Sequence, residues 1–276
     1  MIMIVVMLLM IAGGIGLAQA LSDPDQVTLR WLRLGGIIAV CLLAVTAVMT
    51  RSDETQVDFT FWLLPAGTAF VVQLILVQLG RRRSQRVAAF IAFVLTGAVV
   101  CQAMPGLDLM APSEDRTTEV ESWTNRPVAL QPPDVTAFVT TLYLSMALTG
   151  GYMMAMLLGH AYLTAGNEMT QRPFRRIVRA LALILIVRAG MTIPFGLLPF
   201  LDRAAEFPGE VWILAMMTAR YAVGLVVPAL LTYMTYDCIK RAANQSATGI
   251  LYVTLVLVIV GEGAALALFI DTGHLF

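Results

Sequence analysis

Three charged residues, Arg188, Arg220 and Glu262, lie inside apolar stretches of the sequence that are long enough to cross a lipid bilayer. The stretches read ALILIVRAGMTIPFG, AMMTARYAVGL and VLVIVGEGAALAL. A charge near the centre of a bilayer costs several kcal/mol unless it is paired or hydrated, so such a residue is a functional candidate by default. Consecutive helices are usually neighbours. We therefore expect these residues to form an Arg–Glu–Arg cluster inside a helix bundle.

Two arginines and one carboxylate leave a spare positive charge in this cluster. An anionic ligand, a quinone carbonyl or a carboxylate of a partner subunit could meet that charge. The alternative is that the cluster only locks three helices together. Buried ion pairs are weak sources of stability, so a purely structural role does not by itself explain them.

His160 is the second residue with chemical potential, and it follows a methionine-rich stretch. Met156 lies four residues before it and shares its helix face. A His–Met pair can bind haem iron or Cu(I), but His274 is the only other histidine. We therefore expect no metal site and no haem. Histidine exchanges protons near neutral pH, so His160 and Tyr162 are candidates to bind a quinone head group. An interfacial histidine bonded to a nearby carbonyl is the plainer alternative.

Asp237 is unusual because it lies beside a basic segment. It could line a cytoplasmic proton path with His160, with Glu262 deeper in the membrane. The alternative is a pairing of Asp237 with Lys240 or Arg241 at the membrane surface, which would contribute little to stability.

The composition of the chain predicts the membrane-spanning helices that must position these residues. The 276 residues are 59% hydrophobic and 13% charged, whereas soluble domains carry about 25% charged residues. Continuous apolar stretches of about 20 residues predict helices instead of a barrel. We expect an all-α integral membrane protein of about eight transmembrane helices, near 1–21, 31–50, 58–79, 87–105, 136–164, 177–200, 211–236 and 248–270.

Orientation follows from the excess of Lys and Arg in cytoplasmic loops. Basic clusters occupy alternate connections: Arg81, Arg82, Arg83 and Arg86; Arg172, Arg175, Arg176 and Arg179; Lys240 and Arg241. The remaining connections are acidic or mixed. These patterns predict that both chain ends lie outside, in a multi-pass protein of the cell's inner (cytoplasmic) membrane. Ala18-Gln19-Ala20 resembles a signal-peptidase site, but no basic residue precedes it, so we expect a retained first helix.

The chain divides into three regions: helices 1–4 in 1–105, an extracytoplasmic loop in 106–135, and helices 5–8 with the charged cluster in 136–276. The loop is rich in proline and acidic residues. It could cap the outer face, dock a partner, or only link two four-helix halves. In the last region, Pro194 and Pro228 predict helix kinks that free backbone carbonyls.

Several functions are excluded by what the sequence lacks. It contains no Walker A, GxGxxG, HExxH or GxSxG motif, and its three cysteines are isolated, which excludes a disulfide framework and a zinc site. The formal net charge is zero, so nucleic acid is not an expected partner. The general layout resembles the cofactor-free quinone-binding anchors of bacterial respiratory complexes, a resemblance of architecture that rests on no motif.

We therefore expect a membrane subunit of a respiratory electron-transfer complex that binds quinone or supports proton transfer within the bilayer. No tightly bound cofactor is expected; quinone is the candidate ligand, and partner subunits would carry the redox centres. The chain would then be a quinone-site subunit of a larger oxidoreductase, not a stand-alone enzyme. The first alternative is a secondary transporter of a small anion, which the spare arginine charge and the kinked helices suit. The second is a membrane scaffold or assembly protein.

Overall fold

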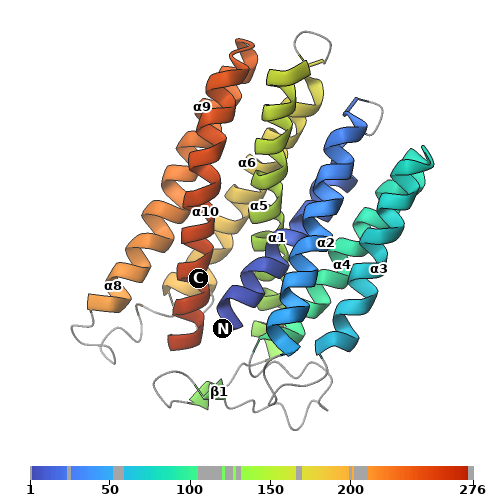
Figure 1. Ribbon diagram of the computed structural model, residues 1–276. Helices are drawn as coiled ribbons and strands as arrows, with labels where there is room; N and C mark the ends of the chain where they lie inside the picture. The colour runs from blue at the N-terminus through green and yellow to red at the C-terminus, as the bar shows by residue number, and fades with distance from the viewer. Residues whose placement is uncertain are drawn as a thin grey trace.

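The fold is an all-α bundle, seen here in a computed structural model that describes residues 2–23, 26–51, 59–104, 120–121, 127–128, 132–165, 170–198, 201 and 211–272. The described residues include eight helices that are long and apolar enough to cross a membrane. They run side by side and alternate in direction (Figure 1). The predicted fold class and number of spans are confirmed.

The first four helices include a central apolar helix, α1. They are α1 (Ile2–Leu21), α2 (Leu29–Arg51), α3 (Phe59–Gln78) and α4 (Arg82–Ala103). The helix α1 carries no charged residue and packs against α2, α4 and α5. Gln19 of α1 donates a hydrogen bond from Nε2 to the Leu32 carbonyl of α2 at 2.8 Å. The position of α1 therefore brings α2 close to α5, although α2 and α5 are far apart in the sequence.

The remaining spans contain the three intramembrane charges. They are α5 (Pro132–Ala165), α6 (Arg172–Thr192) followed by η2 (Ile193–Leu197), the continuous series α8 (Val211–Thr218), η4 (Ala219–Val226) and α9 (Val227–Lys240), and α10 (Asn244–Thr272). The helix α6 packs against α5 and α9, and α10 packs against α5, η4 and α9. The helices α6 and α10 therefore both pack against α5, and η4 packs against α10.

Several helices begin earlier than the hydrophobic pattern predicts. The helices α4, α6 and α10 start at Arg82, Arg172 and Asn244, where the apolar stretches predict starts at 87, 177 and 248. Arg and Gln are good helix formers, and Pro173 occupies a first-turn position that favours proline. The helices thus continue past the apolar stretch into the basic segments.

The two predicted proline kinks take the form of π-helical turns. The helix η2 contains Pro194, and η4 ends immediately before Val227 and Pro228. The Leu198 amide donates to the Ile193 carbonyl, and the Val227 amide donates to the Ala222 carbonyl. Proline has no amide hydrogen to donate, and wider turns of this kind give freed carbonyls a new partner inside a membrane.

The connection between the two sets of helices includes a short antiparallel strand pair. The strands β1 (Val120–Glu121) and β2 (Pro127–Val128) pair Val120 with Val128 and Glu121 with Pro127. Most of the predicted loop 106–135, with its predicted role as a cap, docking surface or linker, lies outside the described residues. The helix α5 begins at Pro132, inside the range predicted as loop.

The basic connections gather at one end of the bundle. The turns between α3 and α4, α5 and α6, and α9 and α10 lie at that end, together with the turn between α1 and α2, which is not basic (Figure 1). The start of α1 and the end of α10 lie at the other end, on the side of β1 (Figure 1). We call these the basic end and the opposite end. That the basic end faces the cytoplasm remains a prediction from the charge bias.

Candidate functional site

The structure brings Arg188, Arg220 and Glu262 together in one cluster. Glu262 of α10 forms an ion pair from Oε1 to Nη1 of Arg220 at 2.9 Å, and a longer one from Oε2 to Nη2 of Arg188 at 3.5 Å. The three residues are 1%, 0% and 1% exposed, respectively. We call them the charged cluster. Their interaction was predicted from the sequence, and the helices α6, η4 and α10 supply one residue each.

The charged cluster lies closer to the opposite end than to the basic end. Arg220 follows the start of α8 by nine residues, Arg188 precedes the end of η2 by nine, and Glu262 precedes the end of α10 by ten. At 1.5 Å per residue, each lies about 14 Å from that end of its helix. The three side chains therefore meet at one level of the bundle, as their pairing requires.

Two hydroxyl side chains that the sequence did not single out complete the cluster. Ser145 of α5 donates from Oγ to Glu262 Oε2 at 2.7 Å and accepts from Arg188 Nε at 3.2 Å. Arg188 Nη1 donates to Thr192 Oγ1 at 3.0 Å, and Thr192 Oγ1 donates to the Arg188 carbonyl at 2.8 Å. The signal that could have found Thr192 is its spacing of four residues from Arg188 on one helix. Ser145 joins a fourth helix to the cluster.

A contact between two glycines allows η4 and α10 to approach closely enough for Arg220 and Glu262 to pair. A Cβ atom added at Gly224 would lie 2.5 Å from the Cα atom of Gly261. Glycine permits such close packing of two helix backbones, which membrane helices use widely. The sequence therefore needs glycine at both positions.

The charged cluster is enclosed, and it retains one excess positive charge. Arg220 Nε and Nη2 are buried and have no hydrogen-bond partner among the described residues. A cavity of about 20 Å³ adjoins Arg188 and Glu262 and is otherwise lined mainly by apolar side chains, including Phe138 and Phe269. A water molecule needs about 10–15 Å³ measured in this way. In this conformation the cavity has room for about one water and no larger ligand.

His160 lies in a different place, on the wall of an open pocket near the basic end. The pocket has a volume of about 490 Å³ and lies between the beginning of α2 and the end of α5. We call it the His160 pocket. Its walls are Thr28, Arg30, Trp31, Leu34, Leu157, His160, Ala161 and Thr164.

The α2 wall of the His160 pocket is held in place by two hydrogen bonds. The Thr28 hydroxyl accepts from the Trp31 amide at 3.3 Å, as a cap at the start of α2. The Trp31 indole Nε1 donates to the Met154 carbonyl of α5 at 3.0 Å. Trp31 is 2% exposed. The indole therefore fixes α2 against α5, while His160 and Arg30 remain exposed to the pocket.

Tyr162 does not line the His160 pocket. It is buried, its hydroxyl donates to the Thr170 carbonyl at 2.5 Å, and its ring stacks on Phe174 with centroids 5.3 Å apart. Residues two positions apart point to different sides of a helix. The structure therefore separates Tyr162 from His160, contrary to the expectation that both face one ligand.

Asp237 adopts the plainer of its two predicted roles. Its Oδ2 accepts from Arg241 Nε at 2.9 Å across one helical turn, and both side chains are exposed. Exposed pairs of this kind contribute little to stability. Asp237 does not line the His160 pocket, so the described geometry shows no shared path for these two residues.

Neither a metal-binding group among the described residues nor a known relative identifies the function of the charged cluster or of the His160 pocket. Within the described residues, no group of three or more His, Cys, Asp or Glu side chains is arranged to hold a metal ion. Cys41, Cys101 and Cys238 are free thiols, and His274 lies outside the described residues. No family model, curated protein or solved structure matches the chain. The comparisons thus leave a multi-pass membrane protein whose function has to be argued from its sites.

Proposed function

We propose that this chain is a membrane subunit of an electron-transfer complex and that it binds a quinone head group in the His160 pocket. The observation that carries the proposal is the pocket itself. Its volume of about 490 Å³ falls in the range of about 300–1,000 Å³ that is usual for small-molecule sites. It combines apolar walls with a few polar side chains, as such sites do.

The side chains of the pocket suit the chemistry of a quinone. Each quinone carbonyl accepts a hydrogen bond, and His160 and Arg30 are donors from opposite walls. Leu34 and Leu157 supply apolar surface for the ring. Leu34 is 44% exposed, and an isoprenoid tail would leave the pocket for the bilayer along this side chain.

In this proposal His160 exchanges the protons that quinone redox chemistry requires. A quinone that accepts two electrons and two protons becomes a quinol, and the reverse reaction releases both. Histidine is suited to passing protons near neutral pH. In this proposal the electrons come from, or go to, a haem or iron–sulfur centre of a partner subunit. Arg30 would stabilise negative charge on a quinone oxygen.

A photoreactive quinone tests the location of this site. The chain, reconstituted in lipid vesicles, is illuminated with an azido-quinone and digested, and the labelled peptides are identified by mass spectrometry. We expect label in α2 near Thr28–Leu34 and in α5 near Leu157–Thr164, and we expect excess natural quinone to suppress it. Label that excess quinone does not suppress, or that lies only on other helices, would contradict the proposal.

Purification in a mild detergent tests the proposed membership of a complex. Visible spectra, quinone extraction and identification of co-purifying chains are made on one preparation. The proposal predicts haem-bearing or iron–sulfur partners together with bound quinone. A colourless preparation that has neither partner nor quinone would favour one of the other two functions.

The charged cluster provides the observation that favours a second function, the transport of a small anion. Its excess positive charge, and the two Arg220 nitrogens that have no hydrogen-bond partner in the described part of the chain, could hold an anion. The adjoining cavity of about 20 Å³ is too small for one, so transport would require η4 to move. Uptake of radioactive chloride or formate by vesicles that contain only this chain, and loss of that uptake in Arg220→Gln, would support transport. A scaffold role predicts neither quinone labelling nor uptake.

A further inference from the structure

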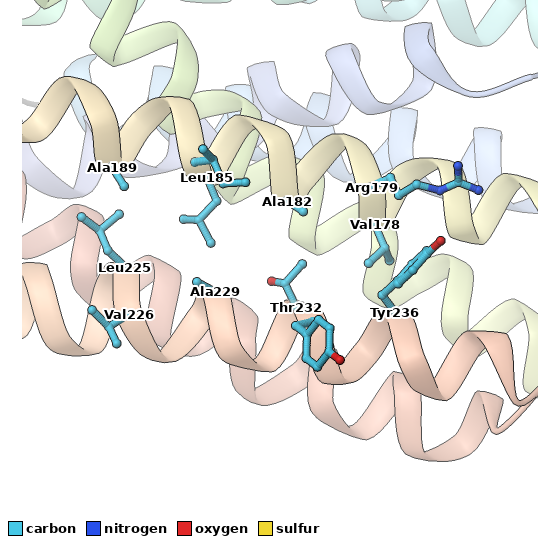
Figure 2. A pocket seen from close by; sticks show the side chains of 12 residues that line it. Val178, Arg179, Ala182, Leu185, Ala189, Leu225, Val226, Ala229, Thr232 and Tyr236 are labelled. Atoms are coloured by element: carbon cyan, nitrogen blue, oxygen red, sulfur yellow. The ribbon is translucent and has the colours of Figure 1, made fainter.

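An apolar groove lies between α6 and α9 on the surface of the bundle, and it shares no lining residue with the His160 pocket. Its volume is about 430 Å³. One wall is formed by side chains of α6 from Val178 to Ala189, and the other by side chains of η4 and α9 from Leu225 to Tyr236 (Figure 2). We call it the α6–α9 groove. Ile186, Val226 and Tyr233 on its rim are 66–71% exposed, so the groove opens to the surroundings of the bundle.

The floor of the groove offers no free polar group. The Thr232 hydroxyl donates to the Pro228 carbonyl at 2.6 Å and shares a hydrogen bond with the Tyr152 hydroxyl at 2.5 Å. Both side chains are buried. Between Leu225 and Thr232 a ligand in the groove therefore meets a mainly apolar surface.

The basic end of the groove is cationic. Arg179 lies on α6 and Lys240 lies on α9. The Arg179 Cζ atom is 5.7 Å from the centroid of the Tyr236 ring, and the Lys240 Nζ atom is 4.6 Å from it. Neither forms a salt bridge among the described residues, and the nearby carboxylate of Asp237 is bound to Arg241. Arg179 and Tyr236 close the same end of the groove in Figure 2. An anionic group at this end would meet two positive charges.

We propose that the α6–α9 groove binds an anionic phospholipid, with one acyl chain in the groove and the phosphate between Arg179 and Lys240. The wall from Val178 to Ala189 is about 16 Å long at 1.5 Å per residue. One leaflet of the hydrocarbon core is about 15 Å thick, so the groove matches the depth that an acyl chain reaches. Basic pockets between membrane helices are known to bind anionic head groups. Because a quinone is neutral, the cationic end favours the phospholipid.

Competition between two lipids tests this site. The chain is reconstituted in equal amounts of dioleoyl phosphatidylglycerol and dioleoyl phosphatidylcholine, extracted in mild detergent, and analysed by native mass spectrometry. Each Lys or Arg near an anionic surface contributes about fivefold to binding. We expect the wild-type chain to retain phosphatidylglycerol over phosphatidylcholine by roughly tenfold or more.

Paired variants separate the groove from general attraction to a charged surface. Arg179→Gln with Lys240→Gln should abolish the preference for phosphatidylglycerol, and Lys240→Gln alone should weaken it. Arg81→Gln with Arg83→Gln removes the same charge from exposed residues at the same end of the bundle and should preserve the preference. Equal loss in both double variants, or retention of phosphatidylcholine as strongly as phosphatidylglycerol by the wild type, would overturn the proposal.

A substitution that narrows the groove tests whether an acyl chain occupies it. Ala182 lines the groove, whereas Leu183 is 63% exposed and does not line it. Ala182→Phe should reduce the retention of phosphatidylglycerol severalfold, and Leu183→Phe should leave it unchanged. Unchanged retention in Ala182→Phe would overturn the proposal, and so would co-purification of a quinone that Ala182→Phe removes.

Discussion

Arg188, Arg220 and Glu262 are at most 1% exposed and are tied to one another, whereas His160 and Arg30 lie exposed on a pocket of about 490 Å³. The charged cluster joins four helices through side chains of this chain alone. The His160 pocket is held open by Trp31, which fixes α2 to α5 without using the imidazole. One region encloses its charged groups and pairs them with one another, and the other leaves its polar groups accessible.

This difference separates two reasons for placing polar residues in a membrane protein. Removing a member of an enclosed cluster leaves a buried charge without its partner, so the main effect falls on stability. Removing an exposed side chain from an open pocket leaves nothing buried, so the main effect falls on binding. The comparison therefore predicts that stability and ligand affinity respond to different substitutions.

The largest loss of stability is expected for Glu262→Ala. It leaves Arg188 and Arg220 buried without their carboxylate, and breaking a buried pair in this way costs about 3–5 kcal/mol. Thermal unfolding in detergent measures the loss. The matched control is Asp237→Ala, which also removes an arginine-paired carboxylate, but an exposed one, and should change the unfolding temperature little. Similar shifts in both variants would contradict the distinction between the enclosed and the open region.

The next largest loss is expected for Gly224→Ala. The new methyl group would lie 2.5 Å from the Gly261 Cα atom, so η4 and α10 would have to separate, at a cost of about 1–3 kcal/mol. Gly263→Ala is the control, because a Cβ atom there meets nothing within 4 Å. The same unfolding experiment compares them. If Gly263→Ala destabilised the chain as much, the glycine contact would not be what allows the cluster to form.

A smaller loss is expected for Ser145→Ala. It removes the hydroxyl that donates to Glu262 at 2.7 Å, and hydrogen bonds between membrane helices contribute about 1 kcal/mol. Thr140→Ala is the control on the same helix, since its exposed hydroxyl bonds only to the Thr136 carbonyl. Unfolding temperatures that fall equally would mean that Ser145 is not part of the charged cluster.

The sequence predicted the parts of the molecule that depend on the bilayer. Eight spans follow from continuous apolar stretches, and the meeting of Arg188, Arg220 and Glu262 follows from the cost of isolated charge in lipid. The π-helical turns lie where Pro194 and Pro228 predicted irregular helices. Each of these predictions uses local information together with one property of the surrounding lipid.

The sequence could not predict contacts that depend on which helices become neighbours. Arg30 and Trp31 meet His160 only because α1 brings α2 beside α5, and nothing local in α2 signals this. Ser145 is one of several hydroxyl residues in α5. It bonds to Glu262 because α10 packs against α5 at this position. The separation of Tyr162 from His160 was predictable, because residues two positions apart do not share a helix face.

The most direct test of the proposed function is the affinity of a short-tailed quinone for wild type and His160→Ala, with the unfolding temperature measured on the same samples. The imidazole donates one hydrogen bond in the proposed complex, so its loss should weaken binding about tenfold. The unfolding temperature should not change, because His160 is exposed. An unchanged affinity, or a loss of affinity that accompanies a large fall in unfolding temperature, would contradict the assignment of the His160 pocket as a quinone site.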